Sequence, residues 1–247
     1  VVATSDHGMP FPRAKASLYN DGSRVPLAIR WPAGIQDTGR VIDHPVNLSD
    51  LAPTFLDSVG LDVPPQMTAK SLFSFFERHK PGRPEAAFIA MERHDGCRAG
   101  GKGYPCRAIR TKEFLYIYNF EPSRWPSGSP DKRMCARSIP YGEIDQSPTK
   151  TYMMENRSLM EIGRLAEFAF GKRPQEELYA VNKDAHQMRN LAGRAGYIKK
   201  QAMLREKLFT HLRDTKDPRV VGGPVLWDYY PYYGKITTEG WKVDSRP

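Results

Sequence analysis

The sequence predicts an α/β protein in which the last strands of a mixed sheet, with flanking helices, precede a smaller α+β subdomain. Two observations lead to this fold class. Short β-prone runs alternate with helical segments early in the chain, and a β-hairpin pattern followed by an amphipathic segment comes later. The later part should therefore hold an antiparallel sheet with a packed helix. The expected parts of the chain are 1–84, 85–216 and an aromatic-rich extension at 217–247.

Two strands and two helices are expected in the first part. Ser49 or Asp50 is the expected N-cap of the first helix, and Gly60 suits the position that follows its C-terminus. The run at 1–4 is apolar and is expected to be a buried strand end. The predicted strands are 1–4 and 25–31, and the predicted helices are 49–60 and 71–78.

The second part alternates strands with two amphipathic helices. Between them lies a stretch at 121–149 rich in Pro, Gly and Ser, and long excursions of this kind are usually functional or mobile. The apolar spacing of the last helix predicts a core face through Ile198, Ala202, Leu208 and Leu212, with Leu204 less well placed. The predicted strands are 86–91, 106–111, 113–120 and 177–180, and the predicted helices are 158–170 and 197–213.

The ends and apolar runs of the chain bear on its class. No apolar run approaches the roughly 20 residues of a membrane helix, so no membrane span is expected. The chain has neither an initiator Met nor a signal-peptide pattern, and position 1 falls inside a strand pattern. We therefore expect a C-terminal fragment whose export signal, if any, lies upstream.

The formal net charge is +9, which favours a polyanionic partner, although it is also compatible with solubility alone. No zinc-finger spacing, aromatic RNA-binding motif or basic heptad accompanies the charge, so no nucleic-acid partner is expected. The three cysteines are an odd number and do not form a disulfide framework. Cys97 and Cys106 are compatible with a disulfide in an oxidising compartment or with free buried thiols, and the state of Cys135 is equally open.

A candidate metal pair follows the first strand. Asp6 and His7 stand where the strand ends, the position at which open α/β sheets bind ligands. Neighbouring strand residues point to opposite faces, so both reach one ion only if the backbone turns, which Gly8 permits. Asp suits Ca²⁺ or Mg²⁺, and His moves the preference toward Mn²⁺ or Zn²⁺. A polar turn with an Asx cap is the alternative interpretation.

Lys15 follows closely as a candidate cation for an oxyanion. Taken alone, it is equally a solvated surface charge.

A series of short motifs makes these hypotheses more specific. Taken together, they resemble the C-terminal half of a type I sulfatase of the alkaline phosphatase superfamily, over most of the chain. Within that family the sequence is most similar to the N-sulfoglucosamine sulfohydrolase (sulfamidase) type, through Pro10–Pro12, Tyr104–Arg107 and Asn119–Pro126. The family motifs are Ser5–Gly8, Lys15, Leu18–Pro26, Trp31–Ile35, Leu48–Thr54, Glu177–Tyr179 and Asp184–Ala192.

The resemblance implies roles for three of these residues. Asp6 and His7 match the second pair of metal ligands, and Lys15 matches the basic residue that contacts the sulfate and the leaving-group oxygen. Many sulfatases carry Asn where His7 stands, and Ca²⁺ is the usual metal of the family. Relatives with an Asp-His pair bind Mn²⁺, so the resemblance leaves Mn²⁺ as the alternative. The family nucleophile is a formylglycine made in a C/S-x-P-x-R motif, which this chain lacks. We expect it upstream, and we expect the chain alone to be inactive.

Three further residues are candidates for substrate binding. His94 follows a predicted strand, and Arg98 and Arg107 lie in or beside the basic loop after it. Guanidinium groups bind sulfate and carboxylate bidentately, so the cluster suits an anionic sugar. A structural histidine and a solvated basic loop are the alternatives. The aromatic tail is expected to pack onto its own domain.

The expected function is hydrolysis of sulfate esters or sulfamates on a glycosaminoglycan or another sulfated glycan. A phosphoester or phosphonate hydrolase of the same superfamily and a non-catalytic polyanion-binding homologue are the two rivals. The resemblance implies a periplasmic, extracellular or lysosomal location. The sequence leaves the oligomeric state open.

Overall fold

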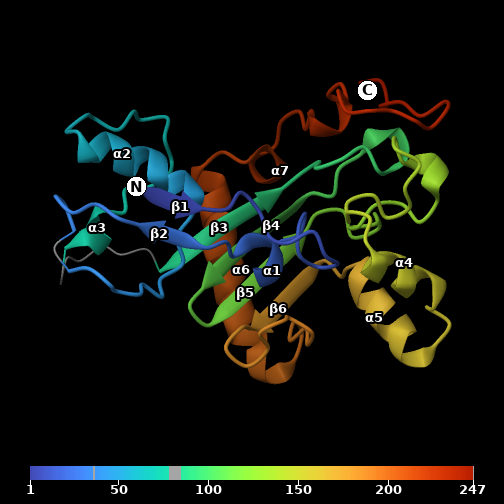
Figure 1. Ribbon diagram of the computed structural model, residues 1–247, viewed down its shortest axis with the longest axis horizontal. Coiled ribbons are helices and arrows are strands. Elements are labelled where there is room, and N and C mark those ends of the chain that lie inside the picture. The colour runs from blue at the N-terminus through green and yellow to red at the C-terminus, as the bar shows by residue number, and fades with distance from the viewer. Residues whose placement is uncertain (36, 78–84, 247) are drawn as a thin grey trace.

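The structure is a computed structural model and describes residues 1–35, 37–77 and 85–246. It contains a two-stranded and a four-stranded sheet, and every strand pair is antiparallel (Figure 1). The small sheet pairs β1 (Val2–Thr4) with β2 (Leu27–Ile29). The large sheet has the order β3 (Ala86–Met91), β4 (Cys106–Thr111), β5 (Phe114–Asn119) and β6 (Glu176–Ala180).

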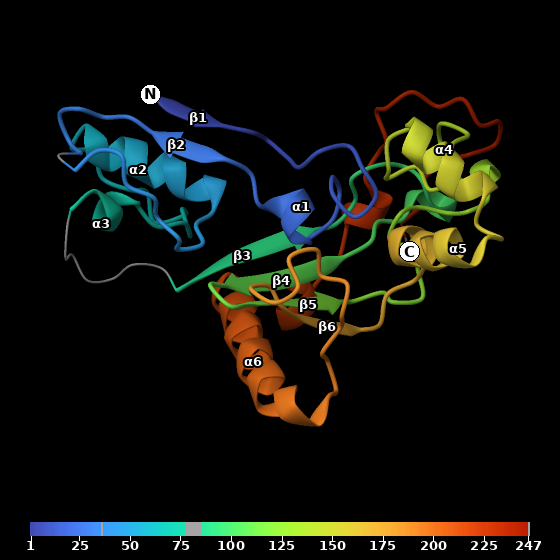
Figure 2. The same ribbon diagram turned by 60° about the horizontal axis from the view of Figure 1, so that its bottom comes forward.

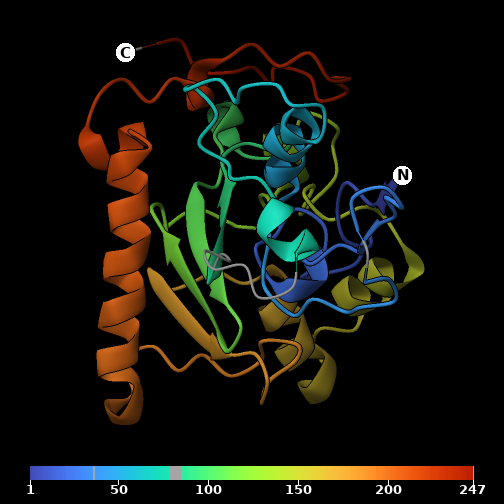
Figure 3. The same cartoon turned by 90° about the vertical axis from the view of Figure 1, so that its left-hand side faces the viewer.

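Both faces of the four-stranded sheet are covered. Figures 2 and 3 show α6 (Ile198–Asp214) on one face, and the N-terminal segment with the short helix α1 (Asn20–Ser23) on the other. Alternation along the strands sends Ala108 and Ile117 into the core under the N-terminal segment, and Ile109 into the core under α6. The N-terminal segment therefore lies directly on the sheet of the second part.

The contact between α6 and the sheet confirms the predicted packed helix but changes its core face. Leu204, Leu208 and Leu212 are buried, whereas Ile198 is exposed. The prediction placed Ile198 on the core face and Leu204 less well, and the structure reverses these two. Ile198 is the first residue of the helix, and its neighbour Tyr197 occupies the position against Phe114 of β5.

The first helical segment begins one residue earlier than predicted, at Leu48. A 3-10 turn (Leu48–Asp50) leads into α2 (Leu51–Ser58), and Asn47 forms a capping box with Asp50. The N-cap of α2 itself is Asp50, one of the two predicted residues, and Asn47 caps the 3-10 turn before it. Gly60 follows the helix with a φ of 72°, as its predicted position requires. A short helix, α3 (Phe73–Phe76), confirms the next prediction, whose end at 78 lies outside the described residues.

The long excursion at 121–149 is followed by the remaining helices. This stretch is irregular except for a 3-10 turn (Lys132–Met134), and α4 (Pro148–Glu155), which was not predicted, begins at its end. The next helix, α5 (Met160–Phe170), confirms the predicted one, but its buried residues are Ala166, Ala169 and Phe170. A one-turn helix, α7 (Pro218–Val221), interrupts the C-terminal extension.

These elements confirm the predicted α/β class with its antiparallel sheet and packed helix. A further detail was wrong: Ala3 and Thr4 of β1 are exposed and not buried. The proposed boundaries between the three parts stay a prediction, and the first of them, at 84, falls outside the described residues. None of the helices in the described part of the chain has the length and apolar character needed to span a bilayer.

Candidate active site

The two candidate metal ligands converge as the backbone turns after β1. Asp6 Oδ2 and His7 Nε2 lie 3.5 Å apart, and both side chains are accessible to solvent. Gly8 is required for a reason beyond its flexibility: a Cβ atom there would lie 1.8 Å from the backbone oxygen of Asp21. Its N–H donates to the carbonyl of Gly22 at 3.2 Å, so the turn is held against the start of the next segment.

The tautomer of His7 follows from its hydrogen bond. Its Nδ1 lies 2.7 Å from the carbonyl oxygen of Gly8. A carbonyl only accepts, so Nδ1 carries a proton, and in the neutral imidazole it is Nε2, beside Asp6, that has the lone pair available to a metal. Histidines that bind metals commonly donate their second ring N–H to a backbone carbonyl in this way. The donor pair therefore suits a divalent cation, although no group of three or more such ligands occurs among the described residues.

Lys15 lies in a tightly folded and locally strained segment. Arg13 and Ala16 have φ angles of 62° and 58°, a conformation that is costly for residues other than glycine. The backbone N–H of Lys15 donates to the carbonyl of Met9 at 3.0 Å. Its Nζ donates to Asp145 Oδ2 at 2.9 Å, so the Lys15 charge is paired with a carboxylate from the long excursion.

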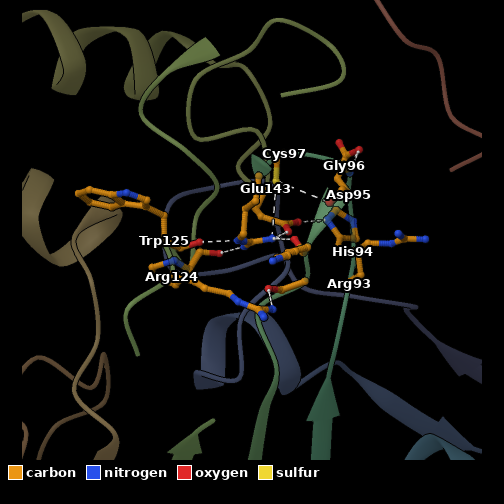
Figure 4. Close-up of polar contacts among 12 residues, drawn as sticks. Arg93, His94, Asp95, Gly96, Cys97, Arg124, Trp125 and Glu143 are labelled. Carbon is orange, nitrogen blue, oxygen red and sulfur yellow. Dashed lines mark hydrogen bonds and ion pairs between the residues drawn. The ribbon is translucent and has the colours of Figure 1, made fainter. Parts of the chain in front are cut away.

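His94 lies in the loop after β3, where its Nδ1 is 2.6 Å from Glu143 Oε2. The other oxygen of Glu143 accepts from Arg98 at 2.8 Å. Figure 4 shows His94 and Glu143 pointing toward one another, with Trp125 nearby. Glu143 is 2% exposed, whereas the side chain of His94 is 37% exposed. The buried carboxylate therefore holds an imidazole whose other side is open.

Charge pairing in this cluster shifts its pKa values. The hydrogen bond to Glu143 raises the pKa of His94 above its ordinary value, against the opposing effect of burial. Burial favours a higher pKa for Glu143, but Arg98 and His94 outweigh it and hold that pKa below the usual range. The carboxylate therefore stays ionised and favours the protonated imidazole.

The structure brings Lys15 and His94 together through one short loop. Their partners, Asp145 and Glu143, are two residues apart. The nearby positive charge of Lys15 also works to lower the pKa of His94, against the larger effect of Glu143. Lys15 and Glu143 also line the same cavity, of about 40 Å³, together with Arg13, Tyr104 and Arg173. Tyr104 Oη and Arg173 Nε are buried there with no hydrogen-bond partner within the described part of the chain. By volume, the cavity suits two or three water molecules.

The two candidate arginines are occupied by internal contacts. Arg98 is 5% exposed and also donates to the carbonyls of Trp125 and Pro126, each at 2.7 Å. Arg107 is 3% exposed and pairs with Glu92 and Asp217, each at 2.6 Å. A buried guanidinium with this many acceptors has no free edge for a ligand. The contacts thus favour structural roles for both arginines, in place of the predicted substrate contact.

The cysteines are all buried and free. Cys135, not Cys106, lies beside Cys97, and its thiol donates to the Cys97 carbonyl at 3.3 Å. Burial raises the pKa of Cys135 to about 11 and that of Cys97 well above its ordinary value, which keeps both thiols protonated.

The sequence interpretation did not identify Glu143 and Asp145, which pair with His94 and Lys15, or the role of Asp95 beside His94. The only available signal was the excursion that carries Glu143 and Asp145, because its length and composition are typical of functional loops. Asp95 directly follows His94 and accepts hydrogen bonds from Arg137, Tyr232 and the backbone N–H of Gly96.

Comparison with known proteins shows which proteins the chain resembles. Residues 8–126 match the family model described as N-sulphoglucosamine sulphohydrolase, C-terminal. An ulvan-active sulfatase of Formosa agariphila is 27% identical over 82% of this chain and 31% of its own length. Human N-sulphoglucosamine sulphohydrolase is 26% identical over 89% of this chain and 42% of its own length.

A solved structure supports the same assignment at the level of the fold. It was determined in complex with D-glucosamine-2-N,6-O-disulfate, and it aligns with a TM-score of 0.51 and 21% identity over 84% of this chain and 32% of its own. The chain thus spans about a third to two fifths of the length of the proteins it matches. The family model and the relatives thus show that the chain is similar to the C-terminal portion of sulfatases, and the solved structure shows that it shares their fold.

Proposed function

We propose that the protein to which this chain belongs hydrolyses sulfate esters or sulfamates on an anionic glycan. In this proposal the chain supplies Asp6 and His7 to a metal site, Lys15 to the sulfuryl group, and His94 to the substrate. The nucleophile is a formylglycine outside this chain, because no C/S-x-P-x-R motif occurs here. The names of the relatives support the substrate class, since they include an N-sulphoglucosamine sulphohydrolase and a sulfatase active on ulvan.

Asp6 and His7 are proposed to hold Ca²⁺ or Mn²⁺. A carboxylate oxygen and an unprotonated imidazole nitrogen 3.5 Å apart are suited to adjacent positions on one cation. When bound, the cation supplies positive charge to the sulfuryl oxygens. The 85% exposure of Asp6 leaves room for ligands from another part of the protein.

Lys15 and His94 are proposed to act on the anionic substrate directly. Lys15 stabilises the charge that develops on the atom departing with the glycan, an oxygen when a sulfur–oxygen bond breaks and a nitrogen when a sulfur–nitrogen bond breaks. His94, protonated through Glu143, binds a sulfate, carboxylate or hydroxyl group of the sugar through its open Nε2 side.

The observation that carries the proposal is the pairing of these two cations with one acidic loop. Lys15 and His94 are 79 positions apart, yet each pairs with a carboxylate of the same loop, Lys15 with Asp145 and His94 with Glu143. A structural lysine and a structural histidine have no need to share a loop. A site for an anion does, because each added cation raises the local concentration of an anionic ligand.

The substrate class is tested with the full-length protein on matched aryl sulfate, aryl phosphate and phosphonate monoester substrates. Faster turnover of the sulfate supports the proposal. Preferential cleavage of phosphate or phosphonate would assign the protein to the rival hydrolases, and retention on heparin without any hydrolysis would assign it to the polyanion-binding class.

The role of Lys15 is tested by Lys15→Met, which keeps the length of the side chain and removes its charge. We expect kcat to fall by roughly 100-fold or more, the range seen when one charge-stabilising donor is lost. Lys207→Met is the matched control, since Lys207 is also ion-paired, with Glu85 at 3.3 Å, but lies on α6. Equal kcat values in the two variants would remove Lys15 from the site.

A further inference from the structure

The C-terminal tail, defined as residues 229–244, lies against the loop at 93–97 that carries His94. Figure 1 shows the tail running past the end of β3 and the loops that follow it. Arg93 donates to the carbonyl of Tyr230 at 2.8 Å, and Trp241 Nε1 donates to the carbonyl of Met134 at 3.1 Å. Trp241 is 9% exposed, so this end of the tail is anchored and does not trail in solvent.

Asp95 is the centre of these contacts. The hydroxyl of Tyr232 donates to one oxygen of Asp95, and Arg137 donates to the other. The same carboxylate accepts the N–H of Gly96 at 2.7 Å. Its side chain is 8% exposed, so water competes little for these contacts. The residue immediately after His94 is thus fixed from three directions.

Trp241 closes the other side of the loop. A Cβ atom on Gly96 would lie 2.7 Å from the indole ring, so the ring packs onto backbone that has no side chain. The rings of Tyr232 and Trp241 meet edge to face with centroids 5.3 Å apart. The two aromatic residues therefore form one unit that contacts both Asp95 and Gly96.

These contacts flank His94 on both sides. Arg93, Asp95 and Gly96 each touch the tail, while His94 itself contacts Glu143. Figure 4 shows His94 directed to Glu143, with Arg93 and Asp95 on either side of it in the chain. A tail that served only to cover apolar surface would not need hydrogen bonds to the neighbours of this one residue.

We propose that the tail positions His94, with Tyr232 and Trp241 holding the loop so that the imidazole keeps its contact with Glu143 and faces the substrate. The inference rests on the proposed function and deepens it. It makes Tyr232 and Trp241 positioning residues for substrate affinity, because a binding group on a loop needs supporting contacts to hold its geometry.

The test compares two adjacent tyrosines in the full-length protein. Tyr232→Phe removes the hydroxyl that contacts Asp95 and keeps the ring. Tyr233→Phe is the matched control, since Tyr233 is 92% exposed. We expect KM for a sulfated glycan substrate to rise by about threefold to tenfold in Tyr232→Phe only, the range spanned by the loss of one hydrogen bond, with kcat within about twofold.

The second readout follows His94 by NMR across a pH titration. We expect the chemical shift and titration midpoint of its imidazole to change in Tyr232→Phe and not in Tyr233→Phe, at an unchanged thermal midpoint. Identical titrations in the two variants would overturn the positioning role. In an active protein, a shifted titration with an unchanged KM would overturn its link to substrate affinity. The titration needs no turnover, so a protein without sulfohydrolase activity would refute the proposed function while the titration still tested whether the tail positions His94.

Discussion

Replacing Glu143 by Ala tests how the candidate site is held together. The carboxylate is 2% exposed and bonds to Arg98 at 2.8 Å and to His94 at 2.6 Å. Arg98 is itself buried, so the Glu143→Ala variant leaves a guanidinium charge without its carboxylate. Breaking a buried ion pair from one side typically costs about 3–5 kcal/mol of unfolding free energy.

The expected loss lies at the lower end of that range, about 3 kcal/mol. The carbonyl oxygens of Trp125 and Pro126 still accept from Arg98 at 2.7 Å each, so the charge keeps part of its solvation. His94 adds less to the loss, because its side chain is 37% exposed and water replaces part of the contact.

The assay is denaturant unfolding of the full-length protein, with Glu206→Ala as control. Glu206 is an exposed residue on α6 that pairs with Arg213 at 2.7 Å, and its removal should have no measurable effect. In Glu143→Ala the His94 pKa should also fall toward its ordinary value, as measured by NMR. A loss below about 1 kcal/mol would refute the reasoning, because it would place Glu143 among ordinary surface substitutions.

Three further predictions follow from the same contacts. The folded-state pKa of His94 is raised, so its positive charge is present below the ordinary histidine pKa and is lost as pH rises through the raised pKa. KM for the anionic substrate should therefore increase over that pH range. His94→Gln should flatten the dependence of KM on pH. Asp6→Ala should abolish metal-dependent activity in the full-length protein, and unchanged metal content by elemental analysis would contradict it. Leu208→Ala should cost about 2–5 kcal/mol by calorimetry, while Leu165→Ala, at a 45% exposed position, should cost far less.

Local patterns predicted those parts of the fold that local interactions determine. The hairpin of β4 and β5 needs only two β-prone runs joined by a tight turn, and the sequence contains both. The core face of α6 was assigned less well, because Leu204 and Ile198 are both compatible with the apolar spacing of the helix. The sheet decides between them, since its position determines which turns of the helix it covers.

The candidate site shows the same difference between what neighbouring residues predict and what contacts between distant residues determine. Asp6 and His7 could be proposed together because they are adjacent, and Lys15 because it follows them closely. Arg98 and Arg107 were proposed as substrate contacts because guanidinium groups bind anions, and the sequence does not reveal their acidic partners, which lie far along the chain. Glu143 is 45 positions from Arg98, and Asp217 is 110 positions from Arg107. From the sequence alone, a basic loop is expected to be exposed to solvent. Only the fold shows which distant acidic residues pair with it.

The two acidic residues of the loop give its two cations different freedom. Glu143 is buried, so His94 keeps its partner whether or not a substrate is present. Asp145 is 38% exposed, and an ion pair so open to water contributes only about 0–1 kcal/mol. In the proposed site an arriving sulfate would displace Asp145 from Lys15 at little cost, whereas displacing Glu143 from His94 would leave a buried carboxylate without a partner. In the proposed site His94 is the fixed contact that orients the glycan, and Lys15 is the movable one that meets the sulfuryl group.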